Sequence, residues 1–333
     1  MSVATAFDEF RQNLEIDAET LGSAIDMHEK VRAALKARLE GHKRTFLSGS
    51  YARNTRLDPL NDIDIVAVVE STDPWDDDPE EAMRAAGEAV RPDFPGCTIR
   101  YGAHAAKITP SDPPIEGVHL DVVVAIETES GSCLKISERE PESNWKRSDP
   151  EAHACALSKA NGDWAQRLVP LIKQIKHWNR NASGESLKSF HVEALALRIF
   201  AGSGDLPAAE MIQCFFNNAR NSILTPTSSP AVPDGFVDGD MTWGERLAHS
   251  SRLEKASKTA DDAIETAKTD EDAAQDIWYG LFGDPYPEPD KDVRKASIAA
   301  AIRSGTAGIA GGTIVSGGGR AVVPGRAFGA EEP

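Results

Sequence analysis

Two aspartates, Asp62 and Asp64, begin the apolar, β-branched stretch "DIDIVAVVE" and could perform metal chemistry. Alternate side chains of a strand point to opposite faces, so both carboxylates are expected on one face, with Ile63 and Ile65 directed into the core. Neighbouring carboxylates disfavour each other's ionisation, and a divalent cation reverses that penalty. Because carboxylate oxygens are hard ligands, Mg²⁺ or Mn²⁺ is favoured here over zinc.

A third acid, Asp121, lies inside the apolar run "HLDVVVAI". A lone aspartate in such a strand is costly unless it is paired or coordinates a metal. If this strand lies beside the one that begins at Asp62, three carboxylates converge and can hold two metal ions. One ion would orient a triphosphate, the other would lower the pKa of an attacking hydroxyl, and the pair would clamp an in-line displacement.

Gly49 and Ser50 precede these acids in "FLSGSYARNTRL". Glycine lets the backbone approach a phosphate closely, and serine adds a hydroxyl donor beside main-chain N–H groups. The chain has no Walker A sequence, so a nucleotide would bind by another route. Taken alone, Gly-Ser is usually a turn and Asp-x-Asp a capped loop. The prediction of a catalytic site therefore depends on the combination.

The elements that would position these residues fall into two regions. Short β-branched stretches over 44–50, 62–70, 98–109 and 118–127, with a helix over 80–91, predict an α+β unit with a mixed sheet. Beyond about residue 150 the periodicity is helical, over 162–182, 189–202, near 208–221 and over 244–281, with a loop over 225–240. The predicted domains are an N-terminal helical segment packing on the core (1–43), a catalytic domain (44–150), a helical nucleotide-binding domain (151–290) and a flexible Gly-rich tail (291–333).

The composition of the chain limits which partners and which cellular compartment are expected. A net charge of −17 argues against stable binding of duplex nucleic acid but not against a local basic pocket for a small polyanion. The four cysteines are far apart and no Cys-x-x-Cys or His-Glu-x-x-His occurs, so zinc or redox chemistry has no support. The polar N-terminus does not suggest a signal peptide and no run could span a membrane, so a cytoplasmic protein is expected. The acidic run Asp76–Asp78 is interpreted as a solvated loop.

The order Gly-Ser-Tyr-x-x-x-Thr, Asp-Ile-Asp and a later strand aspartate resembles the polymerase β-like nucleotidyltransferase superfamily. Within it, the details are similar to the cGAS/DncV-like nucleotidyltransferases (CD-NTases), over about residues 40–290. The resemblance implies a polymerase β-like palm, an N-terminal spine helix and a C-terminal helical domain, with the active-site cleft between them. It assigns catalysis and metal binding to Asp62, Asp64 and Asp121, and nucleotide binding to Gly49, Ser50 and Thr55.

Later segments extend the resemblance. "LVPLIKQIKHWNR" resembles the family's helix with a phosphate-contacting lysine, and Lys176 is the best match. In "LKSFHVEAL", Ser189 would contact the triphosphate and Phe190 would stack on a base, although Phe190 could instead be a core residue. "AAQDIWYGLFGDPYP" resembles the family's W…FG…P signature, in which Trp278 and Phe282 are expected to pack.

The resemblance implies a synthase that joins NTPs, with ATP the leading substrate and GTP or others as alternatives. A 3′- or 2′-hydroxyl attacks an α-phosphate, Asp121 assists its deprotonation, and cyclisation gives a di- or trinucleotide messenger. In bacterial anti-phage signalling, that product activates a downstream effector. The alternatives are a nucleotidyltransferase acting on tRNA, a protein or a small molecule, and a catalytically silent, antitoxin-like binding protein. Three mutually repelling acids argue against the silent protein.

The resemblance also suggests two kinds of partner protein. One is an operon-encoded regulator. The other is a ubiquitin-transfer-like enzyme that conjugates the C-terminal tail near "RAFGA", although the final Glu331–Pro333 suits such a reaction poorly.

Overall fold

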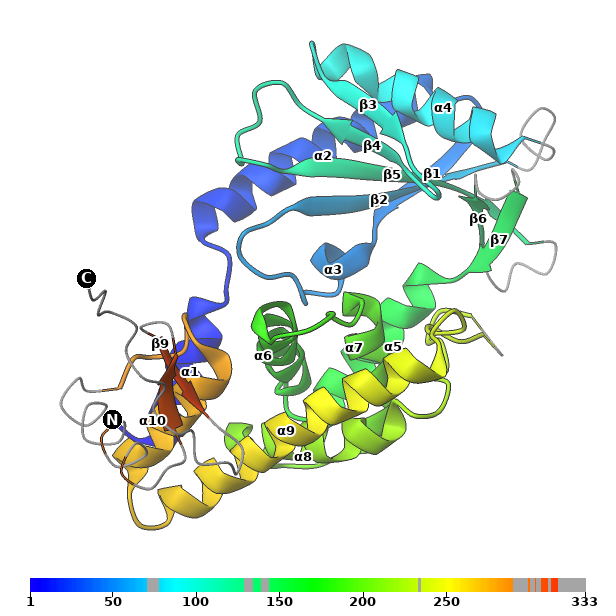
Figure 1. The fold of residues 1–333 in the computed structure, drawn as a ribbon. Coiled ribbons are helices and arrows are strands. Elements are labelled where there is room, and N and C mark those ends of the chain that lie inside the picture. Colours follow the sequence, from blue (N-terminus) through cyan, green and yellow to red (C-terminus); the bar gives the residue numbers. More distant parts are fainter. Residues whose placement is uncertain are drawn as a thin grey trace, which may run out of the picture.

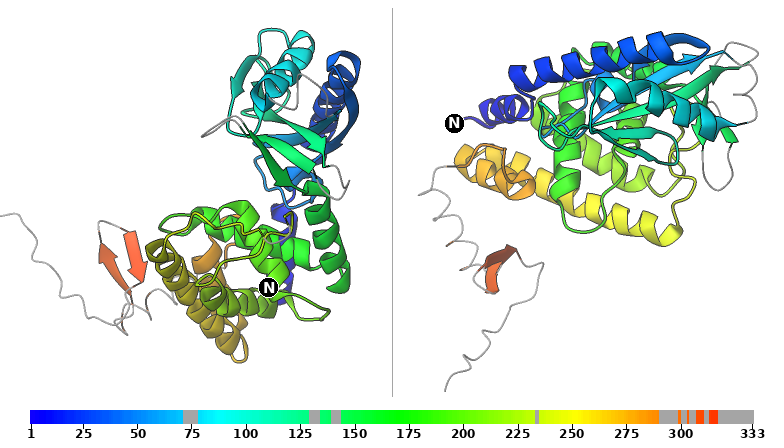
Figure 2. Two further views of the ribbon diagram at one scale, coloured as in Figure 1. Left: turned by 90° about the vertical axis from the view of Figure 1, so that its right-hand side faces the viewer. Right: turned by 90° about the horizontal axis from the view of Figure 1, so that it is seen from above.

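The computed structural model describes residues 1–70, 78–128, 134–138, 144–232 and 235–289, and near the C-terminus residues 299, 303, 307–310 and 313–316. These residues form two lobes, one built on a β-sheet and one built of helices (Figure 1). The two lobes are also distinct when the molecule is turned by 90° (Figure 2, left). This α+β architecture, with a helical region after the sheet, confirms the predicted fold class.

The sheet of the first lobe is mixed. Its described strands are β1 (His42–Leu47), β2 (Asp62–Val69), β3 (Thr98–Tyr101), β4 (Ala106–Thr109), β5 (His119–Glu127), β6 (Leu134–Glu138) and β7 (Asn144–Ser148). The order is β1-β2-β5-β4-β3, with β6 pairing β5 and β7 pairing β6. Only the β2–β5 pair among these is parallel, and that pair carries the aspartates.

Two details of the sheet differ from the sequence-based prediction. Residues 98–109 are two strands rather than one, because a turn closed by the Gly102 N–H donating to Ala105 O (2.9 Å) reverses the chain. The β6–β7 hairpin was not predicted at all.

Helices cover one face of the sheet and leave the aspartates on the other. α2 (Ala18–Arg38) and α4 (Pro79–Val90) share a core with Ile63, Ile65 and Leu120, which are completely buried. Asp62 and Asp64 alternate with these isoleucines along β2, so their side chains lie on the opposite face. The prediction that Ile63 and Ile65 point into the core is therefore confirmed.

The second lobe is helical. It contains α5 (Pro150–Asp163), α6 (Leu168–Asn181), α7 (Ser189–Ile199), α8 (Ala208–Ser222), α9 (Trp243–Ala267) and α10 (Glu271–Phe282). A continuous helix over 162–182 was wrong, because Ala165 and Gln166 adopt left-handed backbone angles (φ 49° and 64°) that end α5. The stretch 244–281 likewise divides before α10, where the Asp270 side chain accepts a hydrogen bond from Ala273 N–H.

The two N-terminal helices join different lobes. α1 (Val3–Asn13) packs on the helical lobe, with Phe7 against Trp278 (ring centroids 5.0 Å apart) and Phe10 against Phe282 (4.8 Å). α2 instead lies along the sheet lobe (Figure 2, right). The packing roles predicted for Trp278 and Phe282 are confirmed, since both side chains are buried in the core that receives α1.

The C-terminal region contains a short hairpin of β8 (Ala307–Ala310) and β9 (Thr313–Ser316). Apart from residues 299 and 303, the rest of the predicted tail lies outside the described residues, as do Asp76 and Asp77. Among the described helices, none has the length and apolar character needed to cross a membrane.

Candidate active site

The pairing of β2 with β5 brings the three predicted catalytic aspartates together. In this parallel pair Asp64 lies directly opposite Asp121, and Asp62 lies opposite His119. Residues paired across adjacent strands share a face, so all three carboxylates project from the side of the sheet that the helices leave open. The convergence expected from the sequence is thus what the strand register produces.

The surroundings of Asp64 and Asp121 raise the pKa values of both carboxyl groups. Burial, followed by the charges of Asp62 and Asp121, raises the pKa of Asp64 to about 7, although Arg53 opposes this. Burial also raises the pKa of Asp121, while His119 and Lys107 act in the opposite direction. The Asp121 Oδ1 atom is buried and has no hydrogen-bond partner among the described residues. Because this buried oxygen has no hydrogen-bond donor, a bound cation would compensate its charge.

The donor set fits a hard divalent cation, but the side chains are not gathered around one point. Three carboxylates offer the all-oxygen ligands that Mg²⁺ and Mn²⁺ prefer. Within the described part of the chain, no group of three His, Cys, Asp or Glu side chains is already arranged to hold a metal ion. Binding of a cation by all three carboxylates would therefore require their side chains to move.

The Gly49 turn is pressed against this carboxylate site. Gly49 begins the short helix α3 (Gly49–Ala52) with φ 63°, and a Cβ placed on it would lie 1.6 Å from Asp64 Oδ2. The Ser48 N–H also donates to the Asp64 backbone oxygen (2.9 Å). Glycine is therefore required here for both its backbone angle and its lack of a side chain. Ser50 follows Gly49 within α3, and its contact with a phosphate stays a prediction.

Thr55 and Lys176, both predicted to bind nucleotide, are buried side chains that contact each other. The Lys176 Nζ atom donates to Thr55 Oγ1 (3.0 Å) and to Glu193 Oε1 (2.5 Å). Lys176 lies on α6 in the helical lobe, whereas Thr55 follows α3 in the sheet lobe. Their direct contact with a nucleotide stays a prediction, because each already has partners across the two lobes.

Ser189 and Phe190 lie at the start of α7. Ser189 is the exposed first residue of the helix. Phe190 is half-buried, with its ring edge-on to His153 at a centroid distance of 4.7 Å. The predicted roles of both residues at the triphosphate and base remain predictions.

Three charged residues near the site were not singled out from the sequence. Arg53 follows α3, and Glu193 on α7 accepts its Nε–H at 2.6 Å. Arg180 lies four residues after Lys176 on α6, and the charge of Asp62 partly offsets the lowering of its pKa by burial. The i, i+4 spacing from Lys176 to Arg180 is a sequence signal that could have identified Arg180.

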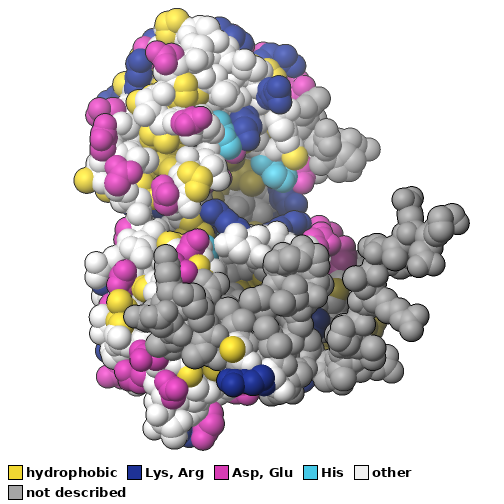
Figure 3. All heavy atoms as spheres, turned by 60° about the vertical axis from the view of Figure 1, so that its left-hand side comes forward, with side chains coloured by type: hydrophobic (Ala, Val, Ile, Leu, Met, Phe, Trp, Pro, Cys, Tyr) yellow, Lys and Arg dark blue, Asp and Glu magenta, His cyan; other side chains and the backbone are white. Residues whose placement is uncertain are grey.

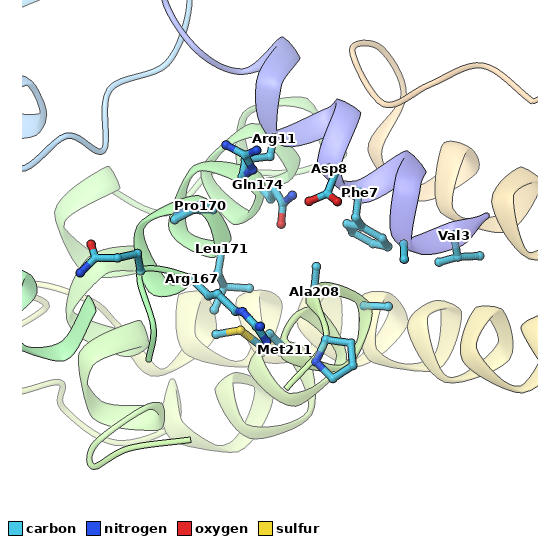
Figure 4. A pocket seen from close by; sticks show the side chains of 14 residues that line it. Val3, Phe7, Asp8, Arg11, Arg167, Pro170, Leu171, Gln174, Ala208 and Met211 are labelled. Atoms are coloured by element: carbon cyan, nitrogen blue, oxygen red, sulfur yellow. The ribbon is translucent and has the colours of Figure 1, made fainter. Parts of the chain in front are cut away.

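The space-filling view shows the two lobes separated by a hollow. Histidine, lysine and arginine side chains lie along this hollow between the lobes (Figure 3). A separate cavity of about 590 Å³ lies between α1, α6 and α8, and Figure 4 shows Phe7, Arg11, Gln174 and Met211 around it. None of the predicted site residues lines that cavity, so it is distinct from the carboxylate site.

Residues 1–161 match the family of Second Messenger Oligonucleotide or Dinucleotide Synthetase domains. The chain is 25% identical, over 324 residues and 91% of each protein, to a cyclic AMP-AMP-AMP synthase of Acinetobacter sp. (strain ATCC 27244 / 9458). A probable cyclic nucleotide synthase of Bacillus cereus (strain VD146) is 23% identical, with 85% of this chain and 97% of that protein covered.

Solved structures share the fold. The CdnC protein of E. coli MS115-1, determined with ATP, superposes with a TM-score of 0.67 at 15% identity and covers 86% of this chain and 99% of its own. The CD-NTase CdnG of Bradyrhizobium diazoefficiens, determined with GTP, gives a TM-score of 0.64 at 16% identity, covering 89% of this chain and 98% of its own.

Proposed function

We propose that this chain is a CD-NTase, a nucleotidyltransferase of the cyclic oligonucleotide synthase class, and that it converts ATP into a cyclic di- or trinucleotide messenger in anti-phage signalling. The observation that carries this proposal is the in-register pairing of Asp64 with Asp121, two residues from Asp62, on the open face of the sheet. A set of converging carboxylates against a glycine turn suits metal-assisted transfer of a nucleotidyl group.

The three aspartates would hold Mg²⁺ or Mn²⁺, two ions in all, and the ions would supply charge neutralisation at the phosphates and acidify the attacking hydroxyl. Asp121 is our candidate to accept the proton of that hydroxyl, since burial raises its pKa above the ordinary range of a carboxylate. The hydroxyl oxygen then bonds to the α-phosphorus of an NTP, and pyrophosphate leaves. No covalent enzyme intermediate is needed.

The backbone of Gly49 and the Ser50 hydroxyl would contact the triphosphate, as a glycine turn at a helix start permits. From the helical lobe, Ser189 would add a hydroxyl donor to the triphosphate and Phe190 would stack on a base. Lys176 and Thr55 would contact the triphosphate directly once a nucleotide is bound, or would hold in place the residues that contact it. Arg180 would face the phosphates, because its charge already interacts with that of Asp62.

ATP is the proposed first substrate. The Acinetobacter relative is a cyclic AMP-AMP-AMP synthase, and the CdnC structure was determined with ATP. A ring of three adenylates is accordingly the product we would look for first. The CdnG structure was determined with GTP, so GTP is tested as a second substrate.

Incubation with α-labelled NTPs and Mg²⁺ or Mn²⁺, followed by phosphatase, tests the function. We expect a phosphatase-resistant product whose mass identifies ring size and base. Asp62→Ala and Asp64→Ala should each lower synthesis by at least about 100-fold, because each removes a metal ligand. Asp112→Ala, at an exposed loop acid, is the matched control and should keep wild-type activity.

Other results would favour the alternatives. Label transferred to added tRNA or protein would favour a nucleotidyltransferase with a macromolecular acceptor. No turnover of any NTP with either metal would favour a silent binding protein. Full activity in both aspartate variants would contradict the assignment of the site.

Protein partners form a second part of the proposal. CdnC has been solved in complex with a HORMA protein, so a regulator encoded nearby is a candidate partner for this chain too. The C-terminal tail is a candidate substrate for a conjugating enzyme. Intact-mass spectrometry after co-expression with the neighbouring genes tests this, and an unmodified C-terminus would count against it.

A further inference from the structure

We propose that Glu193 is a positioning residue that locks the Gly49 turn to the helical lobe and thereby sets the affinity for the NTP. This inference rests on the proposed function for its kinetic consequence, but its structural core is independent of turnover. Glu193 lies on α7 in the helical lobe and contacts residues of the sheet lobe.

Glu193 is the centre of a buried cluster. Its carboxylate accepts hydrogen bonds from Arg53 Nε (2.6 Å), Thr55 Oγ1 (2.6 Å) and Lys176 Nζ (2.5 Å). His153 Nε2 lies 3.2 Å away. We call these five residues, Arg53, Thr55, His153, Lys176 and Glu193, the Glu193 cluster. The Glu193 side chain has no exposed surface.

The cluster carries two cations for one anion. Burial alone would raise the pKa of Glu193, but Lys176 and Arg53 hold it at about 2, so the carboxylate stays ionised. Burial lowers the pKa of His153 to about 3, which leaves its imidazole neutral. The positive charges of Arg53 and Lys176 therefore repel each other, and the Glu193 carboxylate between them compensates this repulsion. Without it, Lys176 would keep only its hydrogen bonds to Thr55 O (3.1 Å) and Thr55 Oγ1 (3.0 Å), and the repulsion between the two cations would be uncompensated.

The cluster also joins the two lobes. His153, Lys176 and Glu193 come from α5, α6 and α7, whereas Arg53 and Thr55 belong to the segment that follows α3. Other described ion pairs between these regions, such as Arg44 with Glu151, are largely exposed and contribute little. The Glu193 cluster is buried, so its charged hydrogen bonds fix the positions of its side chains more strongly than an exposed ion pair would.

The segment that Glu193 holds is the one that lies against Asp64. Thr55 N–H donates to Ser50 O (2.9 Å) and Arg53 N–H donates to Gly49 O (3.3 Å). These bonds make residues 49–55 one closed turn. A displacement of Arg53 or Thr55 would therefore move Gly49 and Ser50, which are the proposed phosphate contacts. Glu193 is not a proposed metal ligand, and its charge raises the pKa of Asp64 less than burial, Asp62 or Asp121 does, so it should affect binding more than the chemical step.

The experiment compares Glu193→Gln with a matched variant, Asp238→Asn. Asp238 is also a fully buried carboxylate with a hydrogen-bonded arginine, Arg246 (2.6 Å), but both lie within the helical lobe. Both variants lose one buried charge and should lower the unfolding temperature. Only Glu193→Gln should speed amide hydrogen exchange over residues 48–55 in the nucleotide-free protein. It should also raise KM for ATP by at least about 10-fold with kcat within about 3-fold.

Glu193→Asp keeps the negative charge on a shorter side chain. Its KM for ATP should lie between the values of the wild type and Glu193→Gln. If Glu193→Gln does not fold, Thr55→Val removes the hydroxyl shared by Lys176 and Glu193 at constant shape, and the same exchange readout applies. Unchanged exchange over 48–55 in the foldable variant would overturn the proposal, as would an equal effect of Asp238→Asn. A wild-type protein that turns over no NTP would contradict the proposed function, while the exchange comparison would still decide the role of Glu193.

Discussion

Asp64 is the residue on which the chemistry of the site depends most. Its carboxylate lies beside two other acids and against the Gly49 backbone, and its pKa of about 7 means that about half of it is protonated at pH 7 until a cation binds. A proton and a metal ion therefore compete for the same oxygens. Activity should rise with pH through about 7, and higher Mg²⁺ should move that rise to lower pH.

The pH dependence of stability gives a direct check on Asp64. Its pKa is about 7 in the folded state against about 3.9 when unfolded, so between those values the folded state binds more protons. The contribution of Asp64 to stability is thus greatest below about pH 4 and falls until about pH 7. At pH 8 Asp64→Asn should be more stable than wild type by about 1–3 kcal/mol, below the limit of about 4 kcal/mol that the whole pKa difference allows. At pH 4 the two proteins should differ little.

Urea unfolding in EDTA at the two pH values measures this difference. The wild-type protein with Mg²⁺ serves as a control, because a bound cation should remove the destabilisation. Equal stability of Asp64→Asn and wild type at pH 8 would mean that the carboxylates do not repel each other as described.

Gly49 provides a second prediction at this scale. Gly49→Ala should lower synthesis by at least about 100-fold, because its Cβ would displace the Asp64 carboxylate or the turn. Gly117→Ala is the matched control: Gly117 also has a positive φ (74°), but nothing lies within 4 Å of its Cβ position. Both variants should lose about 1–2 kcal/mol from backbone strain. Only Gly49→Ala should lose activity in the labelled-NTP assay, and equal activity of the two variants would contradict the close packing.

The residue-level prediction from sequence succeeded where a short-range rule applied. Side-chain alternation placed Asp62 and Asp64 on one face, and the apolar surroundings of Asp121 marked it as unusual. The register that puts Asp121 beside Asp64 is a long-range property, as is the contact of Glu193 with Arg53, 140 residues away. Neither contact could be derived from spacing alone.

At the scale of elements, α6 shows why its buried and exposed residues are hard to tell apart from the sequence. Lys173 and Lys176 would ordinarily be assigned to a solvated face, yet both are buried because Glu15 and Glu193 supply partners from other elements. The break between α5 and α6 lies between Gly162 and Pro170, but the two residues that adopt the left-handed conformation are Ala165 and Gln166, which are not glycines. Strand β2, in contrast, followed its β-branched composition closely.

The attachment of α1 to the helical lobe gives a prediction about this element. Phe10 is completely buried and its ring lies against Phe282 and Tyr286. Phe10→Ala should lower the free energy of unfolding by about 3–5 kcal/mol. Phe236→Ala, at a side chain 56% exposed, should change it by less than about 0.5 kcal/mol. Denaturant unfolding measures both, and a small effect of Phe10→Ala would show that α1 is not part of this core.

At the scale of the whole molecule, two lobes face each other across a hollow, and the chain as a whole is acidic. A net charge of −17 opposes the approach of a polyanion, even though cationic side chains lie along the hollow. The sequence could predict both lobes from the change of periodicity near residue 150. It could not predict that α1 and α2 separate between them, because that division depends on which apolar surface each helix meets.

Duplex nucleic acid should consequently bind weakly. At about 150 mM salt, fluorescence polarisation with a labelled 40-base-pair duplex should show no saturation below about 10 μM protein. A single-stranded and a double-stranded RNA of the same length are useful comparisons. Tight, salt-sensitive binding of any of them would contradict this expectation.

The most direct test of the account is an anomalous-scattering map of crystals grown with Mn²⁺ and a non-hydrolysable ATP analogue. We expect manganese peaks between Asp62, Asp64 and Asp121, with the triphosphate lying between these peaks and the Gly49 turn. Manganese and triphosphate bound away from these three carboxylates would contradict it.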